Sequence, residues 1–328
     1  MQSAQQLSLR SLVQGFIFSL EAERKTPGTI HYYETNLRRF LWYAKEHHWP
    51  DDPRAIDAWK LREFLAYAGG ARNRWGAEGN GSENCREPSK TGGWRYYRTL
   101  RTFFSWAVAE KVLADNPISN IKVVPPKDPL VQPYSQEEMK RLVAACEYDY
   151  ANGDQFLATR NKAVILLFVD SGMRLAELAN LKIDQLDLDR GRAVVLGKGG
   201  WSRTVAFSSG TKKALWKYLA LRQQRAKCSA GDWLWLTEEG TRIKKEGIHI
   251  SFRRIKQRAR VNGPGAVHRL RHTFSVNYLR EVKDPFMLQL LLGHKTLEMT
   301  RRYTQGLRIE EALQAIDVAS PVERLGLG

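Results

Sequence analysis

Residues 185–207 read QLDLDRGRAVVLGKGGWSRTVAF, and this stretch stands out from flanking sequence that favours helices. Three of its segments have strand character: Gln185 to Leu188, Arg192 to Leu196 and Arg203 to Phe207. They are separated by two good turn sequences, Asp189-Arg190-Gly191 and Gly197-Lys198-Gly199-Gly200. The stretch therefore predicts a small antiparallel meander of three strands.

Apolar residues at helical spacing surround this meander. Toward the N-terminus they predict four helices, which begin near Leu9, Pro27, Ile56 and Trp94 and form a small all-α domain. Two more are predicted just before the meander, over Asn161 to Ser171 and from about Leu175, and everything after Ser209 looks helical apart from Trp233 to Leu236. The predicted fold is mainly α with one small antiparallel three-stranded sheet.

A polar stretch, a group of prolines and a capping box mark domain boundaries in the sequence. The stretch from Gly69 to Gly93 has little to bury and is predicted to be a long exposed loop. Repeated prolines between Pro117 and Pro133 forbid a continuous helix, and Ser135-Gln136-Glu137-Glu138 is a capping box that starts a new one. We therefore expect a helical domain over 1–124, a linker over 125–134 and a second domain over 135–328, with a tail at 305–328.

Composition indicates a globular protein with an anionic partner. The 52 Lys and Arg residues outnumber the 35 Asp and Glu residues, which gives a net charge of +17 and favours nucleic acid. The three cysteines have no zinc-site spacing, so no metal is expected. No apolar run approaches the ~20 residues that span a bilayer, and no signal peptide is visible, so we expect a cytoplasmic, nucleoid-associated protein without membrane contact.

Potentially reactive side chains of the second domain lie beside local breaks in the pattern. They are Arg174 after Ser171-Gly172, Lys198 at the hairpin tip, His268 and Arg271 near a helix start, His294 after Gly293, and Tyr303. Each has an ordinary explanation when taken alone, since a lone tyrosine or histidine is more often part of a core and a lone lysine is more often solvated.

The order and local context of these residues resemble the signature of the tyrosine recombinases, the family of phage-type integrases and Xer recombinases. The matching boxes are Gly172-Met173-Arg174-Leu175-Ala176-Glu177-Leu178, Gly197-Lys198-Gly199, His268-Arg269-Leu270-Arg271-His272-Thr273-Phe274, Leu291-Leu292-Gly293-His294 and Tyr303. The resemblance covers Ser135 to Thr304 closely and the preceding helices in layout only. It implies a SAM-like four-helix core-binding domain followed by an α+β catalytic domain.

The resemblance also implies a role for each matching residue. Tyr303 resembles the nucleophile, and Arg174 and Arg271 resemble the two arginines that clamp the scissile phosphate. Lys198 matches the hairpin lysine, which we expect to protonate the leaving oxygen. His268 and His294 match the two histidine positions, of which we take His268 as the general base, and Glu177 matches a supporting acidic position.

What the resemblance implies for the whole reaction is site-specific recombination of double-stranded DNA. A 3′-phosphotyrosyl intermediate would conserve the energy of the broken bond, so no cofactor is needed. Four protomers, identical or shared with a paralogue, would act on two DNA sites through a Holliday junction. Need for an accessory DNA-bending protein stays open, and the strong basicity and the long loop favour a role in DNA integration or excision by a mobile element over resolution.

Two further features fit this interpretation. Basic residues with a prospect of phosphate contact gather in two helical segments: Arg95, Arg98 and Arg101 in one, and Arg253, Arg254 and Lys256 in the other. An apolar stripe of Ile309, Leu313 and Ile316 in the tail either packs on its own core or docks on a neighbouring protomer, as in relatives. We favour docking on the neighbour.

Two other functions stay open at this level. A type IB topoisomerase uses a similar phosphotyrosine reaction, but it relaxes supercoils without exchanging strands. A DNA-binding regulator with a degenerate catalytic site would have the same basic surface. The chain length and the tail favour a recombinase over the first, and the full set of matching positions counts against the second.

Overall fold

The structure is a computed structural model that describes residues 7–70, 90–126, 132–197, 200–227, 230–265, 267–294 and 296–304. The chain forms two compact units, Met1–Asp128 and Pro129–Gly328, here called the N-terminal and C-terminal units. Lys198, most of the predicted 69–93 loop, the middle of the predicted linker and the 305–328 tail lie outside the described residues.

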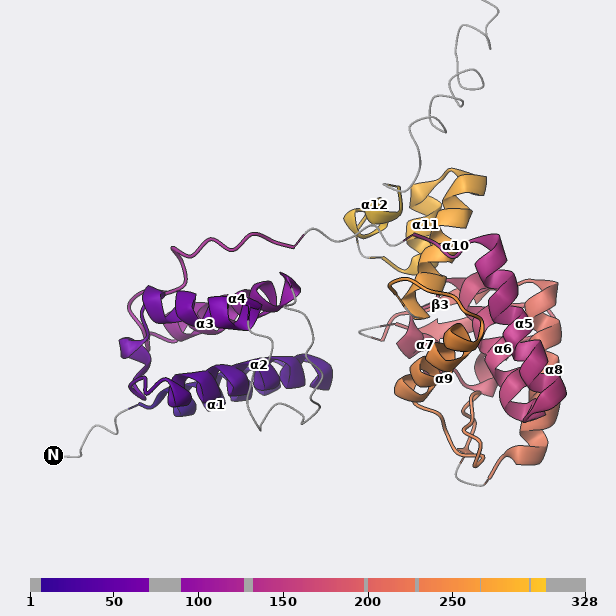
Figure 1. Cartoon of the computed structure of the whole chain (residues 1–328), viewed down its shortest axis with the longest axis horizontal. Helices are drawn as coiled ribbons and strands as arrows, with labels where there is room; N and C mark the ends of the chain where they lie inside the picture. The colour runs from indigo at the N-terminus through magenta and orange to yellow at the C-terminus, as the bar shows by residue number, and fades with distance from the viewer. Residues whose placement is uncertain are drawn as a thin grey trace, which may run out of the picture. The chain divides into compact units, whose positions relative to one another are not determined.

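The N-terminal unit is a bundle of helices (Figure 1). Its elements are α1 (Leu9–Ala22), α2 (Pro27–Glu46), the short 3-10 helix η1 (Pro53–Ala55), α3 (Ala58–Gly70) and α4 (Lys90–Ala109). Local signals set the helix starts, because the Thr26 side chain accepts a hydrogen bond from the Thr29 backbone and Pro27 occupies the first turn. The unit closes around an aromatic core that includes Phe16, Phe40, Phe64, Phe103 and Phe104.

Helix α4 begins earlier than the predicted Trp94, and close packing explains the difference. Gly93 lies inside the helix, and a Cβ built on it would stand only 3.4 Å from the Leu65 carbonyl oxygen and 3.7 Å from Gly69 Cα. The two glycines therefore let α3 and α4 approach closely, which overrides the low helix propensity of glycine. A buried hydrogen bond of 3.1 Å from the Asn36 amide to the Thr99 hydroxyl joins α2 to α4.

The C-terminal unit is mainly helical with one small sheet (Figure 1). In chain order its elements are α5 (Gln136–Asn152), α6 (Gln155–Ser171), α7 (Leu175–Ala179), η3 (Ile183–Gln185), β1 (Leu186–Asp187), β2 (Arg192–Leu196), β3 (Ser202–Ala206), α8 (Ser209–Arg225), α9 (Lys245–Arg258), α10 (Val267–Val282), α11 (Pro285–Leu292) and α12 (Glu298–Thr304). The strands pair antiparallel in the order β1-β2-β3, so the predicted meander and fold class are confirmed.

Helix α6 is the central element of the C-terminal unit. It packs against α5, α8 and α10, and Ile165, Leu167 and Phe168 are completely buried on it. The helix starts at Gln155 rather than at the predicted Asn161, because the Asp154 carboxylate caps it by accepting hydrogen bonds from two backbone N–H groups.

The short apolar run at Trp233 to Leu236 contacts α7. The buried Trp235 indole donates a 2.9 Å hydrogen bond to the Leu178 carbonyl oxygen, and its ring stacks on Tyr218. Within the described parts of the chain, no helix is both long and apolar enough to cross a membrane.

Candidate active site

The turn between α6 and α7 places Arg174. Helix α6 ends at Ser171 and is followed by Gly172, whose φ of 58° lies in the left-handed region. Arg174 then precedes α7 at its N-cap position. A Cβ on Gly172 would stand 2.2 Å from Cδ1 of Phe274 on α10, which leaves no room for a side chain. Glycine is therefore required for both the backbone conformation and the close approach of α10.

Glu177 is the acidic centre of this region. Its carboxylate accepts a 2.7 Å hydrogen bond from the Arg174 backbone and a 2.9 Å bond from the Arg174 guanidinium. Arg203 of β3 donates to both oxygens of the same carboxylate, at 2.9 and 2.8 Å. Burial alone would raise the pKa of Glu177, but these hydrogen bonds and the charge of Arg203 hold the pKa below its ordinary value.

The second predicted arginine, Arg271, is buried on α10 and points at the end of α11. Its guanidinium donates hydrogen bonds to the Gly172 carbonyl oxygen at 2.5 Å and to the Leu292 carbonyl oxygen at 3.1 Å. Burial lowers the pKa of Arg271, and the nearby charge of Arg174 lowers it further. Tyr303 opposes both through its charge and a hydrogen bond.

The last carbonyls of α11 collect three arginines from three different elements. The carbonyl oxygens of Leu291, Leu292 and Gly293 accept hydrogen bonds from Arg203 at 2.9 Å, Arg271 at 3.1 Å and Arg174 at 3.3 Å, in that order. The C-terminal end of a helix has unpaired carbonyls and a partial negative charge, so it attracts guanidiniums. This helix end therefore brings Arg174 and Arg271 together.

His294 follows directly after this turn and is also buried. Its Nε2 lies 2.9 Å from an Arg271 nitrogen, and its Nδ1 lies 2.8 Å from the Thr300 hydroxyl oxygen. A guanidinium can only donate, so Nε2 accepts, and the proton of neutral His294 is on Nδ1, where it is donated to Thr300.

Tyr303, on α12, is buried between two imidazoles. Its ring lies parallel to that of His294, with centroids 6.1 Å apart and planes 8° apart. On α10, His272 meets the same ring at 5.3 Å and a 39° tilt. Together with the interaction with Arg271, these contacts place the phenol beside the arginine that the sequence predicts as a phosphate clamp.

His268 lies one helical turn before Arg271 on α10 and is exposed to solvent. Partial desolvation by the surrounding protein lowers the pKa of His268 from its ordinary value of 6.5, and the charges of Arg271 and His249 lower it further. His268 is therefore neutral at pH 7 and can accept a proton.

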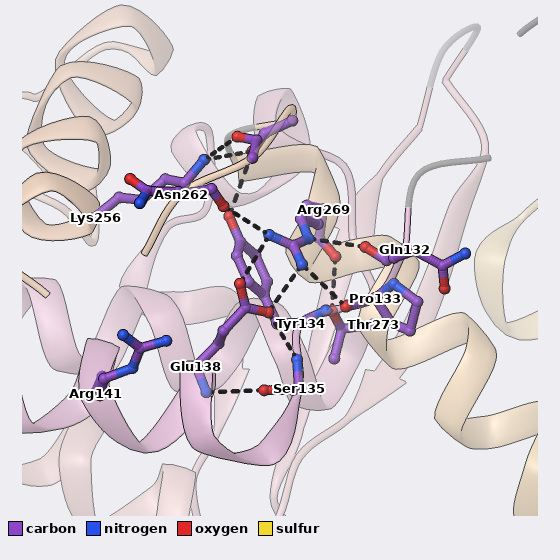
Figure 2. A network of polar contacts seen from close by, with 12 residues as sticks. Gln132, Pro133, Tyr134, Ser135, Glu138, Arg141, Lys256, Asn262, Arg269 and Thr273 are labelled. Atoms are coloured by element: carbon purple, nitrogen blue, oxygen red, sulfur yellow. Dashed lines mark hydrogen bonds and ion pairs between the residues drawn. The ribbon is translucent and has the colours of Figure 1, made fainter. Parts of the chain in front are cut away.

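Arg269, which lies between His268 and Arg271 in the sequence, fixes the first turn of α10. Figure 2 shows its polar contacts. Its guanidinium contacts the Gln132 and Pro133 carbonyl oxygens, both oxygens of Glu138 and the face of the Tyr134 ring. In this environment burial raises the pKa of Tyr134 to about 12. The network ties the start of the C-terminal unit to the helix that carries two predicted catalytic residues.

The predicted DNA-contacting residues differ in their surroundings. Arg95, Arg98 and Arg101 are exposed on α4, and Arg253 and Arg254 are exposed on α9. Lys256 is half-buried, and its ammonium donates to the Gly263 and Gly265 carbonyl oxygens at 2.6 and 3.3 Å, so it supports the turn before α10 (Figure 2).

Three residues of this arrangement are missing from the predicted site: Arg203, His272 and Thr300. A signal for Arg203 exists in the sequence, because it shares a strand face with Val205, whose side chain is buried at a spacing of two residues. An arginine on the core-facing side of a strand needs a buried partner, which here is Glu177. No comparable signal marks His272 or Thr300.

The chain is similar in sequence to known proteins. The Phage integrase family matches residues 134–309. Tyrosine recombinase XerC of Thermodesulfovibrio yellowstonii is 29% identical over 300 residues, which cover 90% of this chain and 91% of that protein.

Two similar solved structures share the fold. The XerH site-specific recombinase in a post-cleavage complex with palindromic difH substrate gives a TM-score of 0.70 at 22% identity, covering 96% of this chain and 85% of that one. A lambda integrase tetramer bound to a Holliday junction gives 0.67 at 17% identity, covering 93% and 80%. Because the family match extends over more than half of its length, this chain belongs to the phage integrase family of tyrosine recombinases.

Proposed function

We propose that this protein is a site-specific DNA recombinase in which the Tyr303 phenol attacks the scissile phosphate. The observation that carries the proposal is that Arg174 and Arg271 donate to adjacent carbonyl oxygens at one helix end. The Tyr303 ring lies beside His294, whose Nε2 contacts Arg271. Three groups suited to phosphoryl transfer thus come together from α7, α10 and α12.

The two arginines supply the charge that this reaction needs. A phosphodiester repels nucleophiles, and the pentavalent transition state concentrates more negative charge on its oxygens. Guanidiniums bind such oxygens through forked, permanently charged hydrogen bonds. Arg174 is suited to this because its side chain keeps 36% of its surface exposed while Glu177 and Gly293 fix its position.

Proton transfers are assigned to the remaining residues. His268 is the general base, because its lowered pKa keeps the imidazole neutral and able to accept the phenol proton. Lys198, predicted at the hairpin tip, donates a proton to the leaving 5′ oxygen. His294 orients Arg271, and through Arg271 the phosphate, since its two ring nitrogens have partners at Arg271 and Thr300.

The step balances without a cofactor. A bond forms between the Tyr303 oxygen and phosphorus as the bond between phosphorus and the 5′ oxygen breaks, leaving a 3′-phosphotyrosyl link and a 5′ hydroxyl. A 5′ hydroxyl from another strand then reverses the step and releases Tyr303. The covalent link keeps the energy of the original bond, so ATP is not required. We also propose a metal-independent reaction, because Arg174 and Arg271 supply the positive charge.

DNA binding is assigned to both units. The N-terminal unit acts as the core-binding domain through the exposed Arg95, Arg98 and Arg101, and the C-terminal unit adds Arg253 and Arg254. The lambda integrase tetramer bound to a Holliday junction supports assembly of four protomers. We further propose that they act on two DNA sites and that the 305–328 tail docks on a neighbour. The protomers are identical or include a paralogue, and a bending protein is an optional addition.

Covalent capture tests the proposal without knowledge of the target site. The protein is incubated with sheared genomic DNA of its source, quenched with detergent, and the covalently attached DNA is sequenced. A duplex that carries the captured site and a nick beside the cleavage position then serves as the substrate. We expect Tyr303→Phe to abolish the adduct and to bind this duplex with unchanged affinity.

Each alternative has its own outcome. An adduct formed by Tyr303→Phe would show that another residue is the nucleophile. Relaxation of supercoiled plasmid without sequence dependence or strand exchange would identify a type IB topoisomerase. Binding without any adduct from the unaltered protein would identify a DNA-binding regulator.

A further inference from the structure

Arg203 joins three parts of the candidate active site. It lies on β3 opposite Val195 of the antiparallel neighbour β2. Its guanidinium leaves the sheet and makes three hydrogen bonds, one to the Leu291 carbonyl oxygen and one to each oxygen of Glu177. Only 14% of its side chain is exposed, so the contacts are largely shielded from water.

The shared carboxylate couples Arg203 to Arg174. Oε1 of Glu177 accepts hydrogen bonds of 2.9 Å from both guanidiniums, while Oε2 accepts from Arg203 and from the Arg174 backbone. Arg203 holds the carboxylate from both oxygens, and that carboxylate in turn fixes the backbone and side chain of Arg174. The position of Arg174 therefore depends on Arg203 through the Glu177 carboxylate.

The net charge of this group also indicates that Arg203 supports Arg174. Two guanidiniums share one carboxylate, so the group of Arg174, Glu177 and Arg203 carries a net charge of +1. Without Arg203, the carboxylate would neutralise Arg174 alone, and less positive charge would remain for a phosphate. Arg203 satisfies the buried Glu177 and leaves the charge of Arg174 available.

A second contact reaches the turn before His294. Gly293 has a φ of 61°, and a Cβ on it would stand 3.2 Å from Cδ and 3.4 Å from Nε of Arg203. The Arg203 side chain therefore lies against this turn while it bonds the preceding Leu291 carbonyl oxygen. One side chain thus holds α7 and the end of α11 in a common frame.

We propose that Arg203 is a positioning residue that sets Arg174, through Glu177, for phosphate binding. This inference rests on the proposed recombinase function. A purely structural alternative is that Arg203 only anchors the sheet to α11, in which case its loss would lower the stability of the whole unit and impair every activity alike.

The test uses the full-length protein and the nicked duplex obtained by covalent capture. The variants are Arg203→Ala, Arg203→Lys, Arg174→Ala and the double variant Arg174→Ala with Arg203→Ala. Arg190→Ala is the matched control, because Arg190 lies in the β1–β2 turn of the same sheet with an exposed ion pair to Asp187. The measurements are the rate of adduct formation, the affinity for the duplex and the melting temperature.

We expect Arg203→Ala to slow adduct formation by about 10²-fold, the scale of a small misplacement of a catalytic group, with affinity for the duplex within about threefold. Arg203→Lys keeps the charge without the two-pronged contact and should fall between Ala and the unaltered protein. The double variant should be no slower than Arg174→Ala, because both changes remove the same function.

Several outcomes would overturn the inference. If Arg203→Ala forms the adduct as fast as Arg190→Ala, Arg203 does not act through Arg174. The same conclusion follows if the rate losses of the two single variants multiply in the double variant. If Arg203→Ala loses affinity, melting temperature and cleavage rate together, the role of Arg203 is purely structural. If Arg203→Ala does not fold, the same criteria are applied to Arg203→Lys. Failure of the unaltered protein and of Arg190→Ala to form any adduct would instead contradict the proposed function.

Discussion

The Arg271 guanidinium and the Nε2 atom of His294 lie 2.9 Å apart, and this contact fixes the proton of the neutral imidazole on Nδ1. That proton is donated to the Thr300 hydroxyl at 2.8 Å. A chain of hydrogen bonds thus runs from α10 through the His294 turn to α12, the helix that carries Tyr303.

The end of this chain predicts a role for Thr300. Thr300→Val keeps the shape of the side chain but leaves the buried Nδ1–H of His294 without an acceptor, which costs about 1–3 kcal/mol of stability. We expect adduct formation to slow by roughly tenfold as His294 loses its fixed orientation. Thr300→Ser should restore the rate, and Thr296→Val, at an exposed position in the same segment, is the control. Equal rates for Thr300→Val and the control would contradict the role.

The lowered pKa of His268 predicts the pH dependence of cleavage. Because the neutral form persists below the ordinary value of 6.5, kcat/KM for adduct formation should fall on the acid side with a midpoint below pH 6.5. His268→Asn should remove this limb and slow the reaction by about 10²-fold or more. His249→Asn removes one neighbouring positive charge, so it should move the midpoint upward while cleavage remains. A midpoint above 6.5 in the unaltered protein would count against His268 as the base.

Removal of the negative charge of Glu177 should destabilise the protein. Its side chain is 4% exposed, and Glu177→Gln would leave the partly buried Arg203 without its ion pair. We expect a loss of about 3 kcal/mol in urea unfolding, against about 0–1 kcal/mol for Glu246→Gln, whose pair with Lys245 is exposed.

The same residue should shape acid unfolding. The folded-state pKa of Glu177 lies below its ordinary value of 4.5, so its contribution is fully present above pH 4.5 and is lost as the pH falls through the folded value. Stability of the unaltered protein should therefore fall more steeply below pH 4.5 than that of Glu177→Gln. Parallel curves would show that Glu177 titrates alike in both states.

Alanine substitutions at Gly172 and Gly200 separate the cost of a left-handed backbone from the cost of a steric clash. Gly172→Ala forces a left-handed residue and places its Cβ 2.2 Å from Phe274, whereas Gly200→Ala has a φ of 81° with nothing within 4 Å. We expect a loss of about 3 kcal/mol at Gly172 and about 1 kcal/mol at Gly200 in thermal or urea unfolding. Equal losses would mean that Phe274 moves aside freely.

Much of the fold follows from local sequence. The capping box at Ser135 and Glu138, the Thr26-Pro27 helix start and the turn between β1 and β2 depend on neighbours a few residues away, and each lies where the sequence predicts it. The starts of α4 and α6 were predicted late, because Gly93 is helical only through its packing on α3 and because Asp154 caps α6. The order of the boxes along the chain likewise identifies the family.

What the sequence by itself determined is therefore the set of helices and strands, and the identity of residues suited to phosphate chemistry. Only the tertiary structure decided that Arg174 bonds the Gly293 carbonyl 119 residues away, that Arg203 shares Glu177 with it, and that Tyr303 lies between His272 and His294. The physical reason is the separation along the chain between the residues that make contact. Caps and turns are closed within a few residues of backbone, whereas these contacts exist only after the core has packed α7, α10, α11 and α12 around one helix end.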